Sequence, residues 1–165
     1  MLQDIPGHAR KEGHRLSTLI PFESIHVGEE LGPFEVLVSA EAVAQYCEDW
    51  ADANPWYSGP SPFGGPVAPP AFMAGVLCFR LLGSKFNARA TIGAQTAHRN
   101  LAPLPVGQRM ITRGVIADKY LKRGLEYVVI TSTSYAEDGT PVRESTDHIL
   151  LSVERAEGST DDGRQ

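Results

Sequence analysis

The chain has 165 residues, 42% of them hydrophobic, and carries a formal net charge of -5. This length fits one domain and the hydrophobic share is enough for a packed core, so the composition argues against two full domains and against disorder over most of the chain. The negative balance gives no electrostatic reason to bind nucleic acid or an anionic membrane surface, and we expect neither as a partner.

Both ends of the chain are polar. Residues 1–17 contain two histidines and few apolar side chains, and we expect a mobile arm there. Residues 156–165 are polar and acidic, and we expect a disordered tail. The domain between them is predicted to span residues 18–155. The N-terminus shows no apolar signal segment, which favours a cytoplasmic protein.

The first predicted elements are a short strand and a small helix. Residues 34–38 alternate between apolar and polar, as a strand does. Ser39 follows as a helix N-cap, with Glu41 in the first turn. The helix is predicted to run for about three turns and to end near Ala51. Its apolar positions recur at helical spacing: Val43, Tyr46, Cys47 and Trp50.

Residues 52–70 form a long predicted loop. Prolines and glycines are too dense in this stretch for a regular element to survive. Loops of this length inside compact domains are usually functional or disordered. The aromatic residues Trp56, Tyr57 and Phe63 argue that this loop is ordered and packed.

An apolar helix is predicted next, over residues 72–82. Pro69 and Pro70 stand at its start, where a missing N–H costs nothing, and Gly83 fits its C-terminal stop. Because the segment is apolar on nearly every side, the helix must be wrapped by other structure.

Four long strands, rich in Val, Ile, Thr and Tyr, complete the pattern. They are predicted over residues 91–101, 109–121, 126–136 and 142–153. Asp138-Gly139 is a strong hairpin signal, because these residue types tolerate positive φ. One apolar helix and one antiparallel sheet predict an α+β fold: a single hot-dog domain, whose curved antiparallel sheet wraps around one buried central helix.

The loop resembles a known family at Asp52-Ala53-Asn54-Pro55-Trp56-Tyr57. MaoC-like hot-dog hydratases carry Asp-x-Asn-Pro-x-His just after a small helix, followed by a Gly-rich or Pro-rich loop that opens the central helix. Further stretches are similar to the N-terminal dehydratase-type branch of that family: residues 64–72, 100–107, 122–127 and 137–139. The resemblance covers residues 22–153 and implies a protein that hydrates or dehydrates acyl thioesters.

One position departs from the family pattern. The catalytic pair of the hydratases is the Asp and the His of the motif; Asp52 matches the Asp, whereas Tyr57 stands at the His position. Histidine titrates near neutral pH, but tyrosine, with a pKa of about 10, is a poor base that can still donate a hydrogen bond or act as an acid. His98, in the first long strand, is a candidate replacement base.

The resemblance implies a site built around this loop. Asp52 would orient or activate water, and a backbone N–H at Ala71 or nearby would hold the thioester oxygen. The expected catalytic residues are Asp52, Tyr57 and His98. The expected substrate-binding residues are Asn54, Trp56, Phe63, Gly65, Ala71 and Phe72.

Two functions stay open on this pattern. In one, the chain is a hydratase or dehydratase for a 2-enoyl-CoA or enoyl-carrier thioester. In the other, it is a non-catalytic, substrate-binding subunit of a catalytic MaoC-like chain that keeps Asp and His. The open edge of the sheet predicts a homodimer, or a heterodimer with a second hot-dog chain. A thioesterase is less favoured, because residues 72–82 carry no carboxylate; a natural-product cyclase or isomerase also ranks below the two.

The sequence gives no sign of a metal or a cofactor. Cys47 and Cys78 are its only cysteines and make neither a disulfide framework nor a zinc site, so we expect two reduced thiols. No His, Cys and Asp cluster has metal-ligand spacing, and no Gly-rich phosphate loop follows a strand. The longest apolar stretch, residues 67–82, contains Arg80 and is too short to span a bilayer.

Overall fold

The computed structural model describes residues 21–88 and 91–151. The predicted arm, residues 1–17, and the predicted tail, residues 156–165, lie outside the described residues. The elements, in chain order, are η1 Phe22–Ser24, β1 Glu30–Leu37, α1 Ala40–Asp49, η2 Pro55–Tyr57, α2 Leu77–Leu82, β2 Ile92–Asn100, β3 Arg109–Lys122, β4 Leu125–Tyr135 and β5 Pro141–Leu150. The labels η1 and η2 denote 3-10 helices. The predicted order of strand, small helix, loop, second helix and four strands is confirmed.

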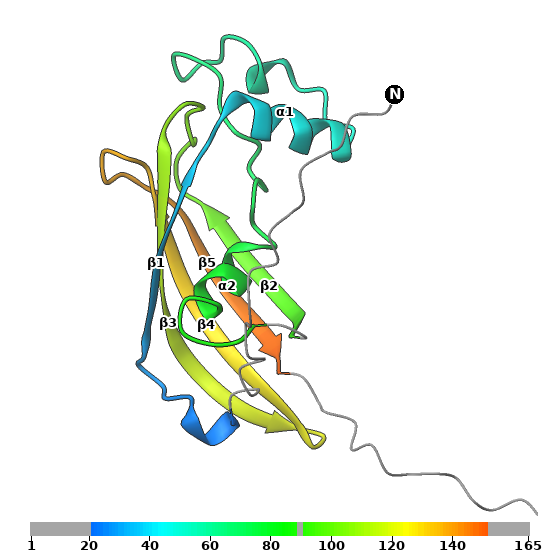
Figure 1. Ribbon diagram of the computed structural model, residues 1–165. Helices are drawn as coiled ribbons and strands as arrows, with labels where there is room; N and C mark the ends of the chain where they lie inside the picture. The colour runs from blue at the N-terminus through cyan, green and yellow to red at the C-terminus, as the bar shows by residue number, and fades with distance from the viewer. Residues whose placement is uncertain (1–20, 89–90, 152–165) are drawn as a thin grey trace, which may run out of the picture.

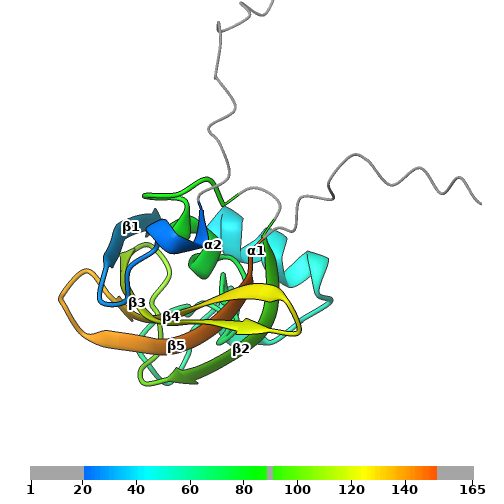
Figure 2. The ribbon, with the colours of Figure 1, turned by 90° about the horizontal axis from the view of Figure 1, so that it is seen from below.

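The five strands form one antiparallel sheet in the order β1-β3-β4-β5-β2. The sheet curves, and α2 lies across its concave face, while α1 and the loop after it cover one end (Figure 1, Figure 2). This confirms the predicted α+β hot-dog arrangement. No helix in the described part of the chain is long and apolar enough to cross a membrane.

Side-chain caps and turn residues set the element boundaries as predicted. Ser39 caps α1: its hydroxyl oxygen accepts a hydrogen bond from the Ala42 N–H at 3.1 Å. Gly139 has a φ of 86°, and the Asp138 carboxylate accepts from the Thr140 N–H at 2.9 Å. These two features close the hairpin between β4 and β5.

The central helix begins later than predicted. The sequence predicts a helix over residues 72–82, but only Leu77–Leu82 is α-helical. Met73 has a φ of 58°, a left-handed conformation that interrupts a right-handed helix. Just before it, the Phe72 N–H donates to the Pro69 carbonyl at 2.9 Å, which closes a single turn. The paired prolines therefore open a series of turns and not the helix itself.

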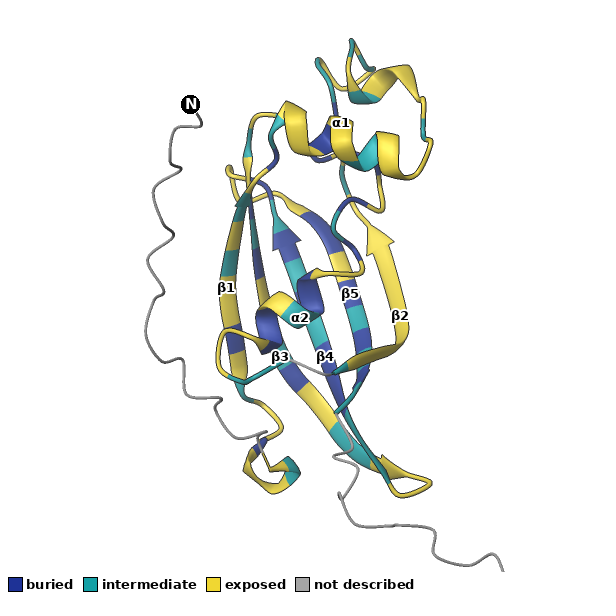
Figure 3. Cartoon of the chain, turned by 45° about the vertical axis from the view of Figure 1, so that its right-hand side comes forward, coloured by how far each residue is buried: buried dark blue, intermediate teal, exposed yellow. Residues whose placement is uncertain are grey.

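The helix is also less enclosed than its composition predicts. Leu77, Cys78, Leu81 and Leu82 are buried. The side away from the sheet is open, and Val76, just before the helix, is 43% exposed (Figure 3). The curved sheet therefore covers one side of α2, as the predicted hot-dog arrangement implies, and the other side stays open among the described residues.

Leu81 seats α2 on the sheet. Its side chain is 0% exposed and lies against Gly32 of β1 and Gly114 of β3. A Cβ atom added at either glycine would lie 2.9 Å from a methyl carbon of Leu81. Glycine at both positions therefore allows the helix to approach the sheet to contact distance.

A second apolar cluster holds the long loop against the end of the sheet. It joins residues from α1, the loop, the approach to α2 and the strands. Its buried members are Val38, Val43, Ala68, Phe72, Leu77, Leu104, Met110, Ala136 and Val142. Ala68 and the partly buried Tyr57 pack into this cluster, whereas Trp56 and Phe63 are 41% and 57% exposed, so the expectation of a packed loop holds only in part.

Gly114→Ala tests the seating of α2. The new methyl group would meet the Leu81 side chain and, at 3.2 Å, the Thr131 carbonyl oxygen. We expect a loss of about 1–3 kcal/mol in the free energy of unfolding, measured in urea. Gly75→Ala is the matched control, since a Cβ atom there meets nothing within 4 Å. Equal stability of the two variants would contradict the packing.

Candidate active site

Asp52 and Asn54 set the conformation of the loop that follows α1. The Asp52 carboxylate accepts a hydrogen bond from the Asn54 N–H at 3.3 Å. The Asn54 side-chain oxygen accepts in turn from the Trp56 N–H at 3.0 Å and caps η2, whose first residue is Pro55. These two overlapping turns reverse the chain and bring Tyr57 back toward Asp52.

Tyr57 and Asp52 interact through their side chains. Burial raises the pKa of the Tyr57 phenol, the Asp52 charge raises it further, and a hydrogen bond with Asn54 partly opposes the rise. The phenol therefore stays protonated at neutral pH and can donate a hydrogen bond. A phenol in this state is a poor base, which agrees with the expectation from its residue type.

The larger of two cavities beside this loop has a volume of ≈ 490 Å³, and we call it the Tyr57 cavity. Apolar side chains make up most of its lining. It brings together four of the residues expected in the site, Asn54, Trp56, Tyr57 and Phe63. Two polar residues of the sheet complete it: Asn100 of β2 and Arg143 of β5.

The second cavity has a volume of ≈ 440 Å³, and we call it the Asp52 cavity. It is lined by Tyr46, Trp50, Ala51, Asp52, Pro69, Pro70 and Ala71. The Ala71 N–H has no hydrogen-bond acceptor among the described residues. The carboxylate and the backbone donor expected from the sequence thus line one cavity, and the two prolines form a wall that it shares with the Tyr57 cavity.

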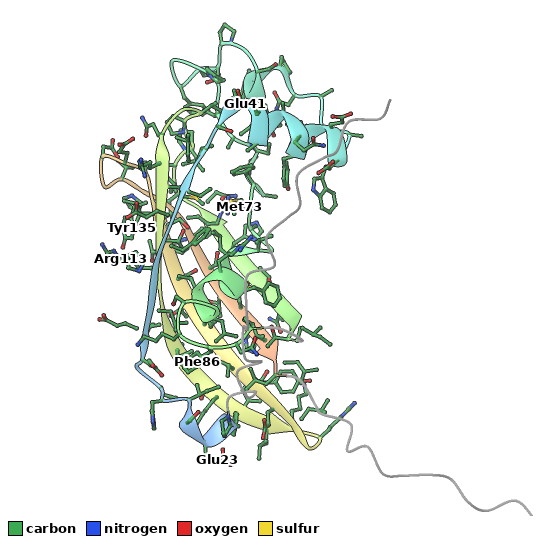
Figure 4. The ribbon with its side chains drawn as sticks, in the orientation of Figure 1. Glu23, Glu41, Met73, Phe86, Arg113 and Tyr135 are labelled. Carbon is green, nitrogen blue, oxygen red and sulfur yellow. The ribbon has the colours of Figure 1, made fainter. Side chains whose placement is uncertain are left out.

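Arg143 ties this shared wall to the sheet. It is 4% exposed, and its Nη2 and Nη1 donate to the carbonyls of Pro70 at 2.7 Å and Phe72 at 2.9 Å. Its Nε donates to the side-chain oxygen of Asn100 at 3.1 Å. The segment it holds continues to Met73, which lies between the loop region beside α1 and the start of α2 (Figure 4). The Pro70 and Phe72 carbonyls accept no backbone hydrogen bond from the described residues, so the guanidinium supplies the donors that a helix would otherwise provide.

Arg143 was not among the residues expected in the site, although the sequence carries a signal for it. Arg143, Ser145, Asp147 and Ile149 alternate along β5 and are all buried. A strand whose buried face is mostly polar is unusual, and a buried polar group is more informative than an exposed apolar one. The alternation of Arg143, Ser145, Asp147 and Ile149 along the predicted strand is therefore the signal that marks Arg143.

Three expected site residues line neither cavity. Phe72 is 4% exposed and packs edge to face on Tyr46, with 5.6 Å between ring centroids. The Gly65 carbonyl accepts a hydrogen bond from the Ser61 hydroxyl. His98 is an exposed residue of β2, at the edge of the sheet. Their roles in binding or catalysis stay predictions.

Asp147 is a buried carboxylate outside both cavities. It is 2% exposed and accepts a hydrogen bond from the Thr96 hydroxyl at 2.7 Å. Burial raises its pKa, while the Thr96 hydrogen bond and the nearby His98 and His148 partly oppose the rise. His98, the candidate replacement base, therefore has Asp147 as an electrostatic neighbour.

Neither cysteine is paired: Cys47 is partly buried and Cys78 is buried, and both are free thiols. Burial raises the pKa of the Cys78 thiol to about 12, so it stays protonated and unreactive. Within residues 21–88 and 91–151, no three His, Cys, Asp or Glu side chains gather in a group that could hold a metal ion.

No protein-family model matches the chain, and no curated protein matches its sequence. Solved structures do match it. The unliganded (R)-hydratase PhaJ1 from Pseudomonas aeruginosa has a TM-score of 0.69 at 17% identity, over 82% of this chain and 88% of that one. The MaoC-like dehydratase from Rhodospirillum rubrum has a TM-score of 0.64 at 21% identity, over 78% and 94%. The chain has the hot-dog fold of the MaoC-like proteins.

A heteromeric structure shares this MaoC-like fold. The HadBC complex from Mycobacterium tuberculosis, a (3R)-hydroxyacyl-ACP dehydratase, matches with a TM-score of 0.62 at 17% identity, over 75% of this chain and 96% of that one. Identities this low establish the fold alone. In this chain both cavities lie between the loop after α1 and the approach to α2.

Asp147→Asn should stabilise the protein at neutral pH. Because burial raises the pKa of Asp147 in the folded state above its unfolded value, the folded state binds more protons between the two values, and stability falls as pH rises through that window. Asn keeps an acceptor for Thr96 and removes the titration. The advantage of the variant should shrink as pH falls toward the ordinary Asp value of about 3.9.

Urea unfolding at a series of pH values measures this difference. Asp118→Asn, on the exposed side of β3, gives the effect of removing one surface charge. A difference between Asp147→Asn and the wild type that does not change with pH would contradict the assignment.

Proposed function

We propose that the chain catalyses the reversible hydration of a 2-enoyl thioester, carried on coenzyme A or on an acyl carrier. The observation that carries the proposal is that the Asp52 carboxylate and an unoccupied Ala71 N–H line the same cavity. The first can accept a proton from water, and the second can stabilise negative charge on a carbonyl oxygen. The fold, shared with solved (R)-hydratases and dehydratases, supports this class of reaction.

The proposed hydration needs one proton acceptor and one oxyanion donor. Asp52 removes a proton from water as the water oxygen bonds to the β-carbon of the enoyl group. The electron pair of the double bond moves toward the thioester oxygen, where the Ala71 N–H holds the developing enolate. The protonated Asp52 then returns its proton to the α-carbon, so both hydrogens of the water end on the product.

Tyr57 acts in this scheme as a hydrogen-bond donor. Burial and the Asp52 charge keep its phenol protonated, so it does not compete with the carboxylate for the water proton. The Asn54 N–H, which donates to the Asp52 carboxylate at 3.3 Å, helps to hold that carboxylate in place. In this scheme Asp52 alone accepts and returns the proton, so the reaction does not need the histidine of the family motif.

The acyl chain is proposed to reach past Pro69 and Pro70 into the Tyr57 cavity. That cavity is largely apolar, with Trp56 and Phe63 among its lining residues, and these two rings meet edge to face at 6.1 Å. Apolar lining with a few placed polar groups is typical of a small-molecule site.

A second candidate function is a substrate-binding subunit that depends on a catalytic hot-dog partner. Tyr57 at the histidine position favours it, and so does β2, an edge strand along which every residue is exposed (Figure 3). Exposed edges of this kind pair readily with another strand. A homodimer would use the same edge. The HadBC neighbour, a complex of hot-dog chains, supports pairing as a general arrangement.

A thioesterase receives less support. It would need a carboxylate on the central helix, and neither α2 nor the turns before it, residues 72–82, carry one. A cyclase or isomerase on this fold has no specific feature of the two cavities in its favour.

Asp52→Asn should lower kcat for hydration of crotonyl-CoA by at least about 100-fold, because the amide cannot accept the water proton. Loss of the enoyl absorbance measures the rate. Asp49→Asn, on the exposed side of α1, is the matched control and should leave kcat unchanged. Unchanged turnover in Asp52→Asn would remove the carboxylate from the mechanism.

The wild-type chain assayed alone separates the two candidate functions. Turnover by the purified chain supports the enzyme. No turnover alone, with activity gained on mixing with a MaoC-like chain that carries Asp-x-Asn-Pro-x-His, would establish the subunit instead.

Ala71→Pro removes the proposed oxyanion donor without adding a charge. Proline has no N–H, and loss of one such donor typically lowers kcat by about 100-fold or more. Ala71→Ser keeps the N–H and should retain near wild-type kcat. A thermal unfolding curve for each variant checks that both fold. Equal kcat for the two would place the oxyanion donor elsewhere.

A further inference from the structure

Arg143 is a buried cation that no carboxylate of the described residues neutralises. Its side chain is 4% exposed, and none of the ion pairs found among the described residues includes it. Its three hydrogen-bond acceptors are neutral: the Pro70 and Phe72 carbonyls and the Asn100 side-chain oxygen. A buried charge is expensive unless it is paired, so an arginine in this setting points to a missing anion.

The guanidinium keeps hydrogen-bonding capacity. It has five N–H donors, and the three bonds use Nε and one hydrogen on each terminal nitrogen. One N–H therefore remains on Nη1 and one on Nη2. Arg143 also lines the Tyr57 cavity, so these donors stand at the wall of an otherwise largely apolar space.

The other polar groups of this cavity are donors as well. The Asn54 side-chain oxygen is occupied by the Trp56 N–H, and the Asn100 oxygen is occupied by Arg143. The Asn100 amide is left with its NH2 group for a ligand, whereas the Asn54 amide already shares a hydrogen bond with Tyr57. Tyr57 carries a protonated phenol. The cavity wall therefore combines a positive charge with several N–H and O–H donors.

We propose that the Tyr57 cavity takes an acyl group that carries its own carboxylate, which pairs with Arg143. This proposal rests on the proposed thioester function and names the substrate class: a thioester of a dicarboxylic acid. A neutral acyl chain would displace water from the cavity and leave the Arg143 guanidinium without a counter-ion. A carboxylate neutralises the charge and accepts charge-assisted hydrogen bonds from the arginine fork.

The test compares two saturated thioesters of equal length. Succinyl-CoA and butyryl-CoA differ at the end of the acyl chain, where one has a carboxylate and the other a methyl group. Neither has a double bond to hydrate, so calorimetry reports binding without turnover. We expect succinyl-CoA to bind at least about tenfold more tightly, the worth of one charge-assisted hydrogen bond or more.

Asn100→Asp supplies the missing anion from within the protein. The new carboxylate keeps an acceptor for the Arg143 Nε and neutralises the guanidinium, and residue 100 is exposed, so the fold should tolerate it. The preference for succinyl-CoA over butyryl-CoA should fall to within about twofold. Gln95→Glu, an exposed position on the same strand that lines neither cavity, adds the same charge and should keep the preference.

Equal affinities for the two thioesters in the wild type would overturn the proposal, as would a preference that survives Asn100→Asp or binding of neither ligand. The hydration assay stays independent of this result. Tighter binding of succinyl-CoA than of butyryl-CoA, without hydration of any enoyl thioester, would support the carboxylate site and reject the enzyme. Hydration of crotonyl-CoA without tighter binding of succinyl-CoA would support the enzyme and reject the carboxylate site.

Discussion

The site depends on the two hydrogen bonds that Arg143 donates to the carbonyls of Pro70 and Phe72. The segment between the long loop and α2 makes turns and no regular helix, and Met73 adopts a left-handed conformation within it. Two hydrogen bonds from a buried side chain of β5 fix that segment to the sheet. This attachment holds Pro70, which lines both cavities, next to Ala71, whose N–H has no acceptor among the described residues.

Close packing of Leu81 on two glycines has a consequence for assembly. It places a short helix on one face of the sheet, and no described residue covers the opposite side of that helix, where Val76 is 43% exposed. The neighbouring edge strand β2 is exposed along its length. A single chain thus leaves both an apolar surface and a row of backbone groups for another strand, which favours the pairing of two hot-dog domains.

The sequence predicted the fold well because its signals are local and strong. Ser39 capped the helix as expected, and Asp138-Gly139 closed the hairpin, since each acts on its own backbone. The extent of the central helix was wrong, because apolar composition does not reveal a left-handed residue such as Met73. The site roles of Asp52 and Tyr57 rest on a motif and stay predictions. Arg143 was not predicted, because its place depends on which strand faces the loop, and that is a tertiary fact.

The direct test of whether Asp52 and the Ala71 N–H act on a thioester is a crystal structure with a bound acyl-CoA analogue. In the analogue, a ketone replaces the thioester and makes it unreactive. We expect the ketone oxygen to lie within hydrogen-bonding distance of the Ala71 N–H and the β-carbon to face the Asp52 carboxylate. The acyl chain should lie in the Tyr57 cavity. An analogue bound with its carbonyl away from Ala71, or with Asp52 turned to solvent, would contradict it.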